Sequence, residues 1–227
     1  MSRLASLAKR IIPTLVLLLA VGGALVVATA TRAADDCKPD GASCKTNQSC
    51  CTGVCTANVC GLRFVDNGDG TITDHHTGLI WEKKDNICPG IHCVNDSYLW
   101  SSTGTAPDGG AFTSFLNTLN GGATGVGNCT SGDGSTPTGG FVNHCDWRLP
   151  TIAELGTIID TSASGCGTGS PCIDATFGPT ASSFYWSSTT GASFPSFAWS
   201  VNFLGGFVFP GNKSIFSFSV RAVRGGS

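Results

Sequence analysis

Cysteine content is the feature that most restricts how this chain can fold. All twelve cysteines lie after residue 36. An even number of cysteines in an exported chain implies disulfides, because the compartments that receive exported proteins are oxidising. The 31 glycines, together with few long helical patterns, also predict a domain rich in turns and short strands. We therefore expect disulfides to hold much of the fold.

Residues 1–33 have the layout of a secretory signal peptide. Basic Arg3, Lys9 and Arg10 precede an apolar stretch over residues 11–30, and small residues follow it. An uncleaved membrane anchor is the alternative, because the stretch approaches the ~20 residues that span a bilayer. We favour cleavage, since acidic residues and a cysteine-rich region follow directly. The expected localisation is secreted, periplasmic or at the cell surface.

The charge of the mature chain excludes one class of partner. Cleavage after residue 33 removes four basic residues and leaves nine against fifteen acidic ones, a formal charge of −6. Charged residues make up only 12% of the chain, which is about half the usual fraction. Binding to a phosphate backbone depends on clustered lysine and arginine. We therefore expect no nucleic-acid partner.

Residues 34–61 form a cysteine-rich module with the spacing C-x6-C-x5-C-C-x3-C-x4-C. Val54 and Val59 are its sizeable hydrophobic residues, so a segment this small needs covalent links to fold. The spacing resembles the knottins, and this resemblance implies the pairs Cys37–Cys51, Cys44–Cys55 and Cys50–Cys60. A spacer and a toxin-like loop display are both open, and we favour the spacer. Zinc is disfavoured because the module has no histidine.

Residues 62–74 read as a hairpin around the Asn67-Gly-Asp-Gly70 turn, whose residue types tolerate positive φ. The string resembles a calcium loop, but glycines stand where an EF-hand needs oxygen ligands. We therefore assign a turn. A second turn over residues 74–78 leads into a strand with Leu79 and Trp81 on one face, so three strands form a meander.

Two segments have helical patterns. Residues 111–119 place four apolar side chains on one stripe, and Asn120 follows them. The second helix begins after Pro150, where Thr151 and Glu154 have capping-box spacing. Its lead-in predicts a packed Trp147 and Leu149, with Arg148 paired to a carboxylate. The buried face comprises Ile152, Leu155, Ile158 and Ile159.

The C-terminal region alternates with period two. In residues 198–203, Trp199, Val201 and Phe203 share one face. In residues 215–222, the apolar face comprises Phe216, Phe218, Val220 and Ala222, and the polar face comprises Ser217, Ser219 and Arg221. A bulge or a change of environment must follow, because Val223 falls on the polar side.

The remaining cysteines lie in or beside glycine-rich loops, which disulfides would close. Pairs that are local in sequence are our prediction: Cys88–Cys93, Cys129–Cys145 and Cys166–Cys172.

Six short strings occur in order over the last two-thirds of the chain: FVDNGDGTITD (64–74), TGLIW (77–81), DWRLPT (146–151), YWSST (185–189), AWSVNF (198–203) and VRAVRG (220–225). The series resembles the Lcl-type C-terminal domain of collagen-like bacterial adhesins, which is related to C-type-lectin-like folds. The resemblance implies an α+β domain over residues 62–227, with two helices and a mostly antiparallel sheet.

The sequence gives no sign of catalysis. Each of the histidines (His75, His76, His92 and His144) reads as a surface or turn residue, and no nucleophile elbow, P-loop or dinucleotide fingerprint is present. The family's fold also occurs in sulfatase-activating oxidases and calcium-dependent lectins, whose reactive-cysteine context and Glu-Pro-Asn or Trp-Asn-Asp strings are missing here. We expect no enzyme activity, no cofactor and no metal.

A ligand surface is expected where phenylalanines concentrate, between residues 184 and 218. Rings in segments interrupted by glycine and proline would form one exposed patch, and such patches often mark interaction sites. Cover for the core beneath is an equally open reading. The candidate ligand-binding residues are Phe194, Phe197, Asn202, Phe207, Phe209, Asn212 and Lys213.

These observations predict an exported, non-enzymatic binding or adhesion protein whose partner is a glycan or a surface protein. The mature charge disfavours sulfated glycosaminoglycans, with which some adhesins of the resembled family are associated. A structural or assembly role in the cell envelope is the alternative. A diversified display region in the C-terminal strands is a third possibility.

Overall fold

The computed structural model describes residues 41–50, 53–121 and 139–225. Three predictions concern residues outside these ranges. They are cleavage of the signal peptide, the Cys37–Cys51 pair and the Cys129–Cys145 pair, and all three stay predictions. Within the described ranges, none of the helices has the length and apolar character to cross a bilayer. The domain boundaries also stay predictions.

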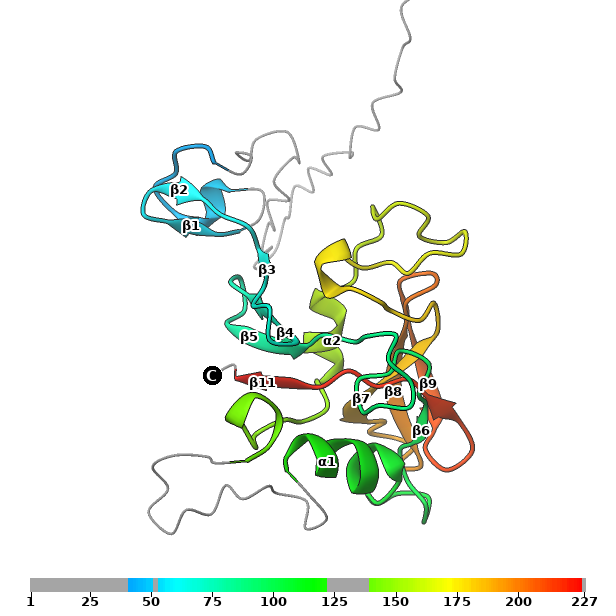
Figure 1. Ribbon diagram of the computed structural model, residues 1–227. Coiled ribbons are helices and arrows are strands. Elements are labelled where there is room, and N and C mark those ends of the chain that lie inside the picture. Colours follow the sequence, from blue (N-terminus) through cyan, green and yellow to red (C-terminus); the bar gives the residue numbers. More distant parts are fainter. Residues whose placement is uncertain (1–40, 51–52, 122–138, 226–227) are drawn as a thin grey trace, which may run out of the picture. The chain divides into compact units, whose positions relative to one another are not determined.

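The cysteine-rich module contains a short helical turn, η1 (Asn47–Ser49), and an antiparallel hairpin of β1 (Cys55–Thr56) and β2 (Val59–Cys60) (Figure 1). Disulfides join Cys44 to Cys55 and Cys50 to Cys60, with S–S distances of 1.99 and 2.04 Å. Two of the three pairs implied by the knottin spacing are thus confirmed. Buried Cys44, Cys50 and Cys60 form the interior of the module.

The expected meander is confirmed as part of a four-stranded antiparallel sheet. Its order is β11 (Val223–Gly225), β5 (Leu79–Glu82), β4 (Thr71–Asp74) and β3 (Phe64–Asp66). The first turn has positive φ at Gly68 (77°) and Gly70 (88°), the conformation that glycine permits. The C-terminal strand β11 therefore lies beside β5, far from it in sequence (Figure 1).

A second sheet comprises β7 (Phe184–Thr190), β8 (Phe197–Asn202) and β9 (Phe207–Asn212), all antiparallel. Strand β8 lies in the middle and β9 at an edge of this sheet. A small antiparallel pair of strands comprises β6 (Tyr98–Leu99) and β10 (Ser217–Phe218). It is linked to β7, because Trp186 Nε1 donates to Tyr98 O at 2.8 Å and Ser219 N donates to Phe184 O at 2.9 Å. The fold is thus α+β, with several antiparallel sheets in place of the expected one.

Both expected helices are present. The first is a π-helical segment, η2 (Ala111–Leu116), that continues into α1 (Asn117–Leu119). The second is α2 (Ile152–Thr157), and its capping box is confirmed, since Glu154 N donates to Thr151 Oγ1 at 3.2 Å and Thr151 N donates to Glu154 Oε2 at 2.7 Å. Short 3-10 turns, η3 (Phe141–Asn143) and η4 (Ala175–Phe177), lie in the connecting loops.

Two hydrophobic clusters form the core of the larger domain. One gathers Trp100, Phe115, Trp147 and Trp186, and the other gathers Trp81, Phe177, Tyr185 and Phe203. The packed lead-in to α2 is confirmed, because Trp147 and Leu149 are buried and Arg148 pairs with Glu154 at 2.6 Å. Aromatic rings thus contribute to both clusters.

The burial predictions for residues 215–222 are wrong at three residues, because Ser219, placed on the polar face with Arg221, is also buried at 6% exposed. Phe216, which alternation placed in the core, is 42% exposed. The reason is that the strand expected over residues 215–222 is reduced to β10, and Phe216 precedes it in a turn. Arg221, which alternation placed on a polar face, is fully buried. The expected change of environment before Val223 is confirmed, because β11 begins there.

Disulfides close two loops of the larger domain as predicted. They join Cys88 to Cys93 and Cys166 to Cys172. Cys145 is disulfide-bonded, and its predicted partner Cys129 lies outside the described residues.

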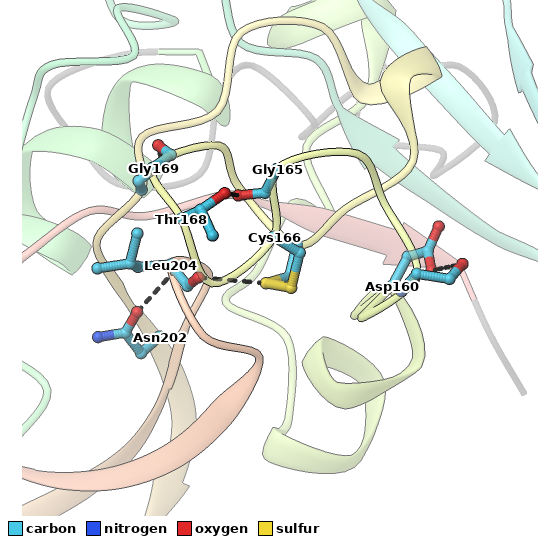
Figure 2. Close-up of a disulfide and its surroundings, with 10 residues drawn as sticks. Asp160, Gly165, Cys166, Thr168, Gly169, Asn202 and Leu204 are labelled. Carbon is cyan, nitrogen blue, oxygen red and sulfur yellow. Dashed lines mark hydrogen bonds between the residues drawn. A yellow bond between two sulfur atoms is a disulfide. The ribbon is translucent and has the colours of Figure 1, made fainter.

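The Cys166–Cys172 loop is attached to the turn between β8 and β9 (Figure 2). Gly167 N donates to Leu204 O at 2.8 Å, and Cys172 N donates to Phe203 O at 2.6 Å. The turn is also held internally, because Leu204 N donates to Asn202 Oδ1 at 2.7 Å. The hairpin that carries β9 is therefore fixed at its closed end.

Truncating a core ring tests this packing. Replacing Trp147 with alanine is expected to lower the free energy of unfolding by about 3–5 kcal/mol, as buried tryptophan truncations do. Urea denaturation of the mutant and the parent chain measures the difference. A loss below about 1 kcal/mol would contradict the packed lead-in.

Candidate functional site

An open apolar pocket of about 600 Å³ lies beside the second sheet. We call it the ring pocket. Its lining contains three aromatic rings and no titratable side chain. The lining residues are Gly191, Ala192, Ser193, Phe194, Phe197, Trp199 and Pro210.

The alternation of β8 and β9 builds one wall of the ring pocket. Phe197 and Trp199 lie two residues apart on β8 and therefore share a face. Pro210 lies directly opposite Trp199 on β9. Pro210 has no backbone N–H, and a proline in a sheet belongs on an edge strand such as β9. The wall is thus a continuous strip of ring and proline surface.

A tight turn between β7 and β8 builds the other wall. Gly191 N donates to Phe197 O at 2.8 Å, and Phe197 N donates to Phe194 O at 2.9 Å. The Phe194 and Phe197 rings meet edge to face, with centroids 6.2 Å apart. Phe194 is nevertheless 67% exposed, so much of its ring surface is available to a ligand.

The opposite face of the same sheet carries a second apolar surface. We call Phe207, Phe209 and Phe216 the phenylalanine patch. Phe207 and Phe209 pack against Phe184 of β7, with ring centroids 6.2 and 5.3 Å away. Phe216 stacks on Phe218, which in turn stacks on Phe184 at 4.9 Å. The patch is therefore the exposed margin of a stack that begins in the core.

The expectation of one continuous ring patch is wrong. Phe194 and Phe197 line the ring pocket, whereas Phe207 and Phe209 lie across the sheet in the phenylalanine patch. Successive side chains of a strand point to opposite faces, and the register of β8 and β9 puts Phe207 and Phe209 on the face opposite Phe197 and Trp199. Whether either set binds a ligand stays a prediction.

The polar members of the predicted set are used inside the fold. Asn202 is 7% exposed, and its Oδ1 accepts the hydrogen bond from Leu204. Lys213 is 1% exposed, and its Nζ donates to Thr105 O at 3.0 Å and lies 3.7 Å from the centroid of a tryptophan ring. Burial lowers the pKa of Lys213. Asn212 Oδ1 accepts from the following turn. We leave all three out of the candidate surface.

Sequence reasoning missed Trp199 and Pro210 as lining residues. It grouped Trp199 with Val201 and Phe203, which are fully buried, although Trp199 is itself only half-buried. The available signal was Pro210, because a proline within a strand pattern marks an edge strand.

A buried charge cluster is the second feature that the sequence did not reveal. It comprises Glu82, Lys84, His92 and Arg221. Glu82 Oε1 accepts from Lys84 Nζ at 2.8 Å and lies 2.8 Å from His92 Nδ1. Arg221 Nη1 donates to the Glu82 carbonyl oxygen at 2.7 Å. Glu82 and Arg221 are both fully buried.

The electrostatics of the cluster favour an ionised Glu82. Burial alone raises the pKa of Glu82, but the Lys84 ammonium and the hydrogen bond to His92 outweigh it, so the pKa lies below its ordinary value. Burial lowers the pKa of Lys84, and Glu82 opposes that shift. The cluster is therefore a compensated ionic group inside the core.

His92 also lines a polar pocket of about 630 Å³ together with Asp66, Asp69, Lys83 and Phe141. A histidine oriented by a carboxylate is half of a base-activated nucleophile site. In the part of the chain that the structure describes, the lining of this pocket includes no serine, threonine or cysteine. The His92–Glu82 pair belongs to the buried charge cluster, and the absence of enzyme activity stays a prediction.

Within the described ranges, one group of side chains has the spacing of metal ligands, namely Cys44, Cys50 and Cys60. Each of these sulfurs belongs to a disulfide, so none is available as a thiolate.

Neutralising Glu82 tests the charge cluster. The Glu82→Gln chain should lose about 3–5 kcal/mol of unfolding free energy at pH 7, because Lys84 and Arg221 lose a buried countercharge. Urea denaturation measures the loss. Asp146→Asn is the control, since that carboxylate is 56% exposed and its pair with Arg224 is worth less than about 1 kcal/mol.

The lowered pKa of Glu82 also predicts how the stability of the chain depends on pH. Because the folded pKa of Glu82 is lowered, its contribution to stability is present above the ordinary value of 4.5 and is lost as pH falls through the lowered pKa. The parent chain should lose stability in this acidic range, and Glu82→Gln should lose less. Equal acid sensitivity of the two chains would contradict the assignment.

Comparison with known proteins identifies one family. The family model of the Lcl C-terminal domain matches residues 70–224, which include the sheet of β7, β8 and β9, the ring pocket and the charge cluster, whereas β3 precedes the matched range. No curated protein and no solved structure matches the chain.

Proposed function

Because the chain belongs to the Lcl C-terminal domain family, we propose that it is an exported, non-enzymatic binding or adhesion protein. Membership of this family indicates a surface-associated, adhesin-type domain. The finer proposal is a C-type-lectin-like scaffold that presents the ring pocket to a ligand outside the cytoplasm. The disulfides of the described residues support an oxidising destination.

The ring pocket is the observation that carries this proposal. Partly exposed aromatic side chains in a concave site are the residues that contribute most to binding at interfaces. Phe194 is 67% exposed, so bringing a ligand onto it would remove apolar surface from water. The lining holds no titratable group, and its one side-chain hydroxyl, on Ser193, has no base in the lining to activate it, so the pocket suits recognition.

The lining favours a surface protein over a glycan as the partner. Sugars are held through many hydroxyl hydrogen bonds, and Ser193 offers the one side-chain hydroxyl of the lining. An apolar side chain of a protein needs no such partners. We therefore propose that the ring pocket receives an apolar group of a surface protein.

A structural or assembly role in the cell envelope is the second candidate. The phenylalanine patch favours it, because Phe207, Phe209 and Phe216 are 50%, 39% and 42% exposed on one face. Apolar surface of this kind is common at subunit interfaces. A stable oligomer in size-exclusion chromatography would favour assembly, and a monomer would favour ligand binding.

Removing the most exposed ring of the pocket tests the first candidate. Phe194→Ser should weaken binding to the partner by tenfold or more, since aromatic hot spots contribute about 2 kcal/mol or more. Its melting temperature should change little. Ile215→Ser is the matched control, because Ile215 is 70% exposed and lies outside the pocket lining.

A glycan and protein array probed with both variants and the parent chain supplies the measurement. Loss of the same protein spots in Phe194→Ser alone supports the proposal. Retained binding by Phe194→Ser would remove the ring pocket as the site, and selective loss of glycan spots would replace the protein partner by a glycan.

A further inference from the structure

We propose that the partner binds as an extended strand added to the free edge of β9, with its side chains resting on the ring pocket and on the phenylalanine patch. This inference rests on the proposed function and specifies the chemistry of the partner: an uncharged, apolar, extended segment of a surface protein. Three independent observations carry it, namely the hydrogen-bonding edge, the two apolar faces and the charge of the region.

At alternate residues of β9, the backbone N–H and C=O groups point away from β8, toward the free edge of the sheet. Ser187 Oγ of β7 donates to Trp199 O at 2.6 Å, so the carbonyl of Trp199 points toward β7 and away from β9. Pro210, opposite Trp199, therefore turns its backbone polar group away from β8. By the same alternation, Val208 directs both its N–H and its C=O to the free edge. An unpaired edge of this kind is a template for another strand.

An added strand would meet apolar surface on both sides of the sheet. Val208 and Pro210 lie on the ring-pocket face, and Phe207 and Phe209 lie on the opposite face. A neighbouring strand lies about 4.8 Å from β9, which is within side-chain reach of both surfaces. Main-chain hydrogen bonds would then supply affinity, and the two apolar surfaces would select the side chains.

The charge of the region specifies the partner further. Residues 175–212 contain no aspartate, glutamate, lysine, arginine or histidine. Exposed edge strands are usually protected by charged side chains, and here Pro210 is the one protective residue in β9. A charged peptide would find no opposite charge along β7, β8 or β9. An uncharged segment fits the edge without leaving a desolvated ion unpaired.

Pro210 also limits how far the added strand can pair. Its missing N–H leaves one acceptor of the partner without a donor, so pairing centres on Val208. Asn212 O is already occupied, since it accepts from Phe216 N at 3.2 Å. A short partner segment, of the length of β9 itself, is therefore expected.

A random ten-residue peptide library displayed on phage, selected on the full chain, tests the inference. The enriched peptides should be uncharged, apolar and free of proline at their centre. A synthetic peptide of the enriched sequence should bind Val208→Lys at least tenfold more weakly than the parent chain, because a charge at an edge opposes strand addition. Val208 is 51% exposed, so this variant should fold.

The control is Ile215→Lys, which adds the same charge at a residue that is 70% exposed and outside β9, and which should bind as the parent does. Val208→Pro is a second variant that removes the outward N–H without adding charge, and it should weaken binding similarly. Melting temperatures confirm that each variant is folded.

Enrichment of charged or proline-rich peptides, or equal binding by the parent chain and Val208→Lys, would overturn strand addition. If Phe194→Ser weakens binding and Val208→Lys does not, the proposed function stands and this inference fails. If neither weakens it, both fail. A dimer of the chain alone that Val208→Lys dissociates would assign the edge to a second copy and overturn the assignment to a separate partner.

Discussion

The larger domain depends on the hydrogen bonds that join Glu82 to Arg221 and Ala222. Ala222 N donates to Glu82 Oε2 at 3.0 Å, Glu82 N donates to Ala222 O at 3.0 Å, and Arg221 Nη1 donates to Glu82 O at 2.7 Å. These bonds join residues that are about 140 positions apart. They hold the segment before β11 against the end of β5, so the described residues between 82 and 221 form an insertion between two neighbouring strands of the four-stranded sheet.

The arginine in this link also connects the sheet to the loop before β7. Arg221 Nη2 donates to Thr180 Oγ1 at 2.8 Å, and its guanidinium lies 5.3 Å from the centroid of the Phe177 ring. Such a network suits arginine, whose planar group has five donors. The cost of burying the charge is offset by the Glu82 carboxylate and by four protein oxygen acceptors.

Sequence reasoning predicted the features whose cause is local. The capping box at Thr151 and Glu154, the hairpin turn at Gly68 and Gly70 and the disulfides that close short loops depend on residues close in the chain, and the structure confirms them. The burial of Arg221 depends on Glu82, so period-two alternation assigned it to the wrong environment. The division of the candidate rings between two faces also depends on contacts between distant residues. The pairing of β8 with β9, and not the spacing of the rings in the sequence, determines which rings meet.

Closure of the insertion has a mechanical consequence. The segment entering the domain at β3 and the segment leaving it at β11 belong to the two edges of one sheet. Tension applied across these two segments is therefore borne by the ladders that join β3, β4, β5 and β11. The hairpin of β8 and β9 lies outside that load path, so stretching the chain would leave the ring pocket and the phenylalanine patch undistorted until the ladder between β5 and β11 ruptured.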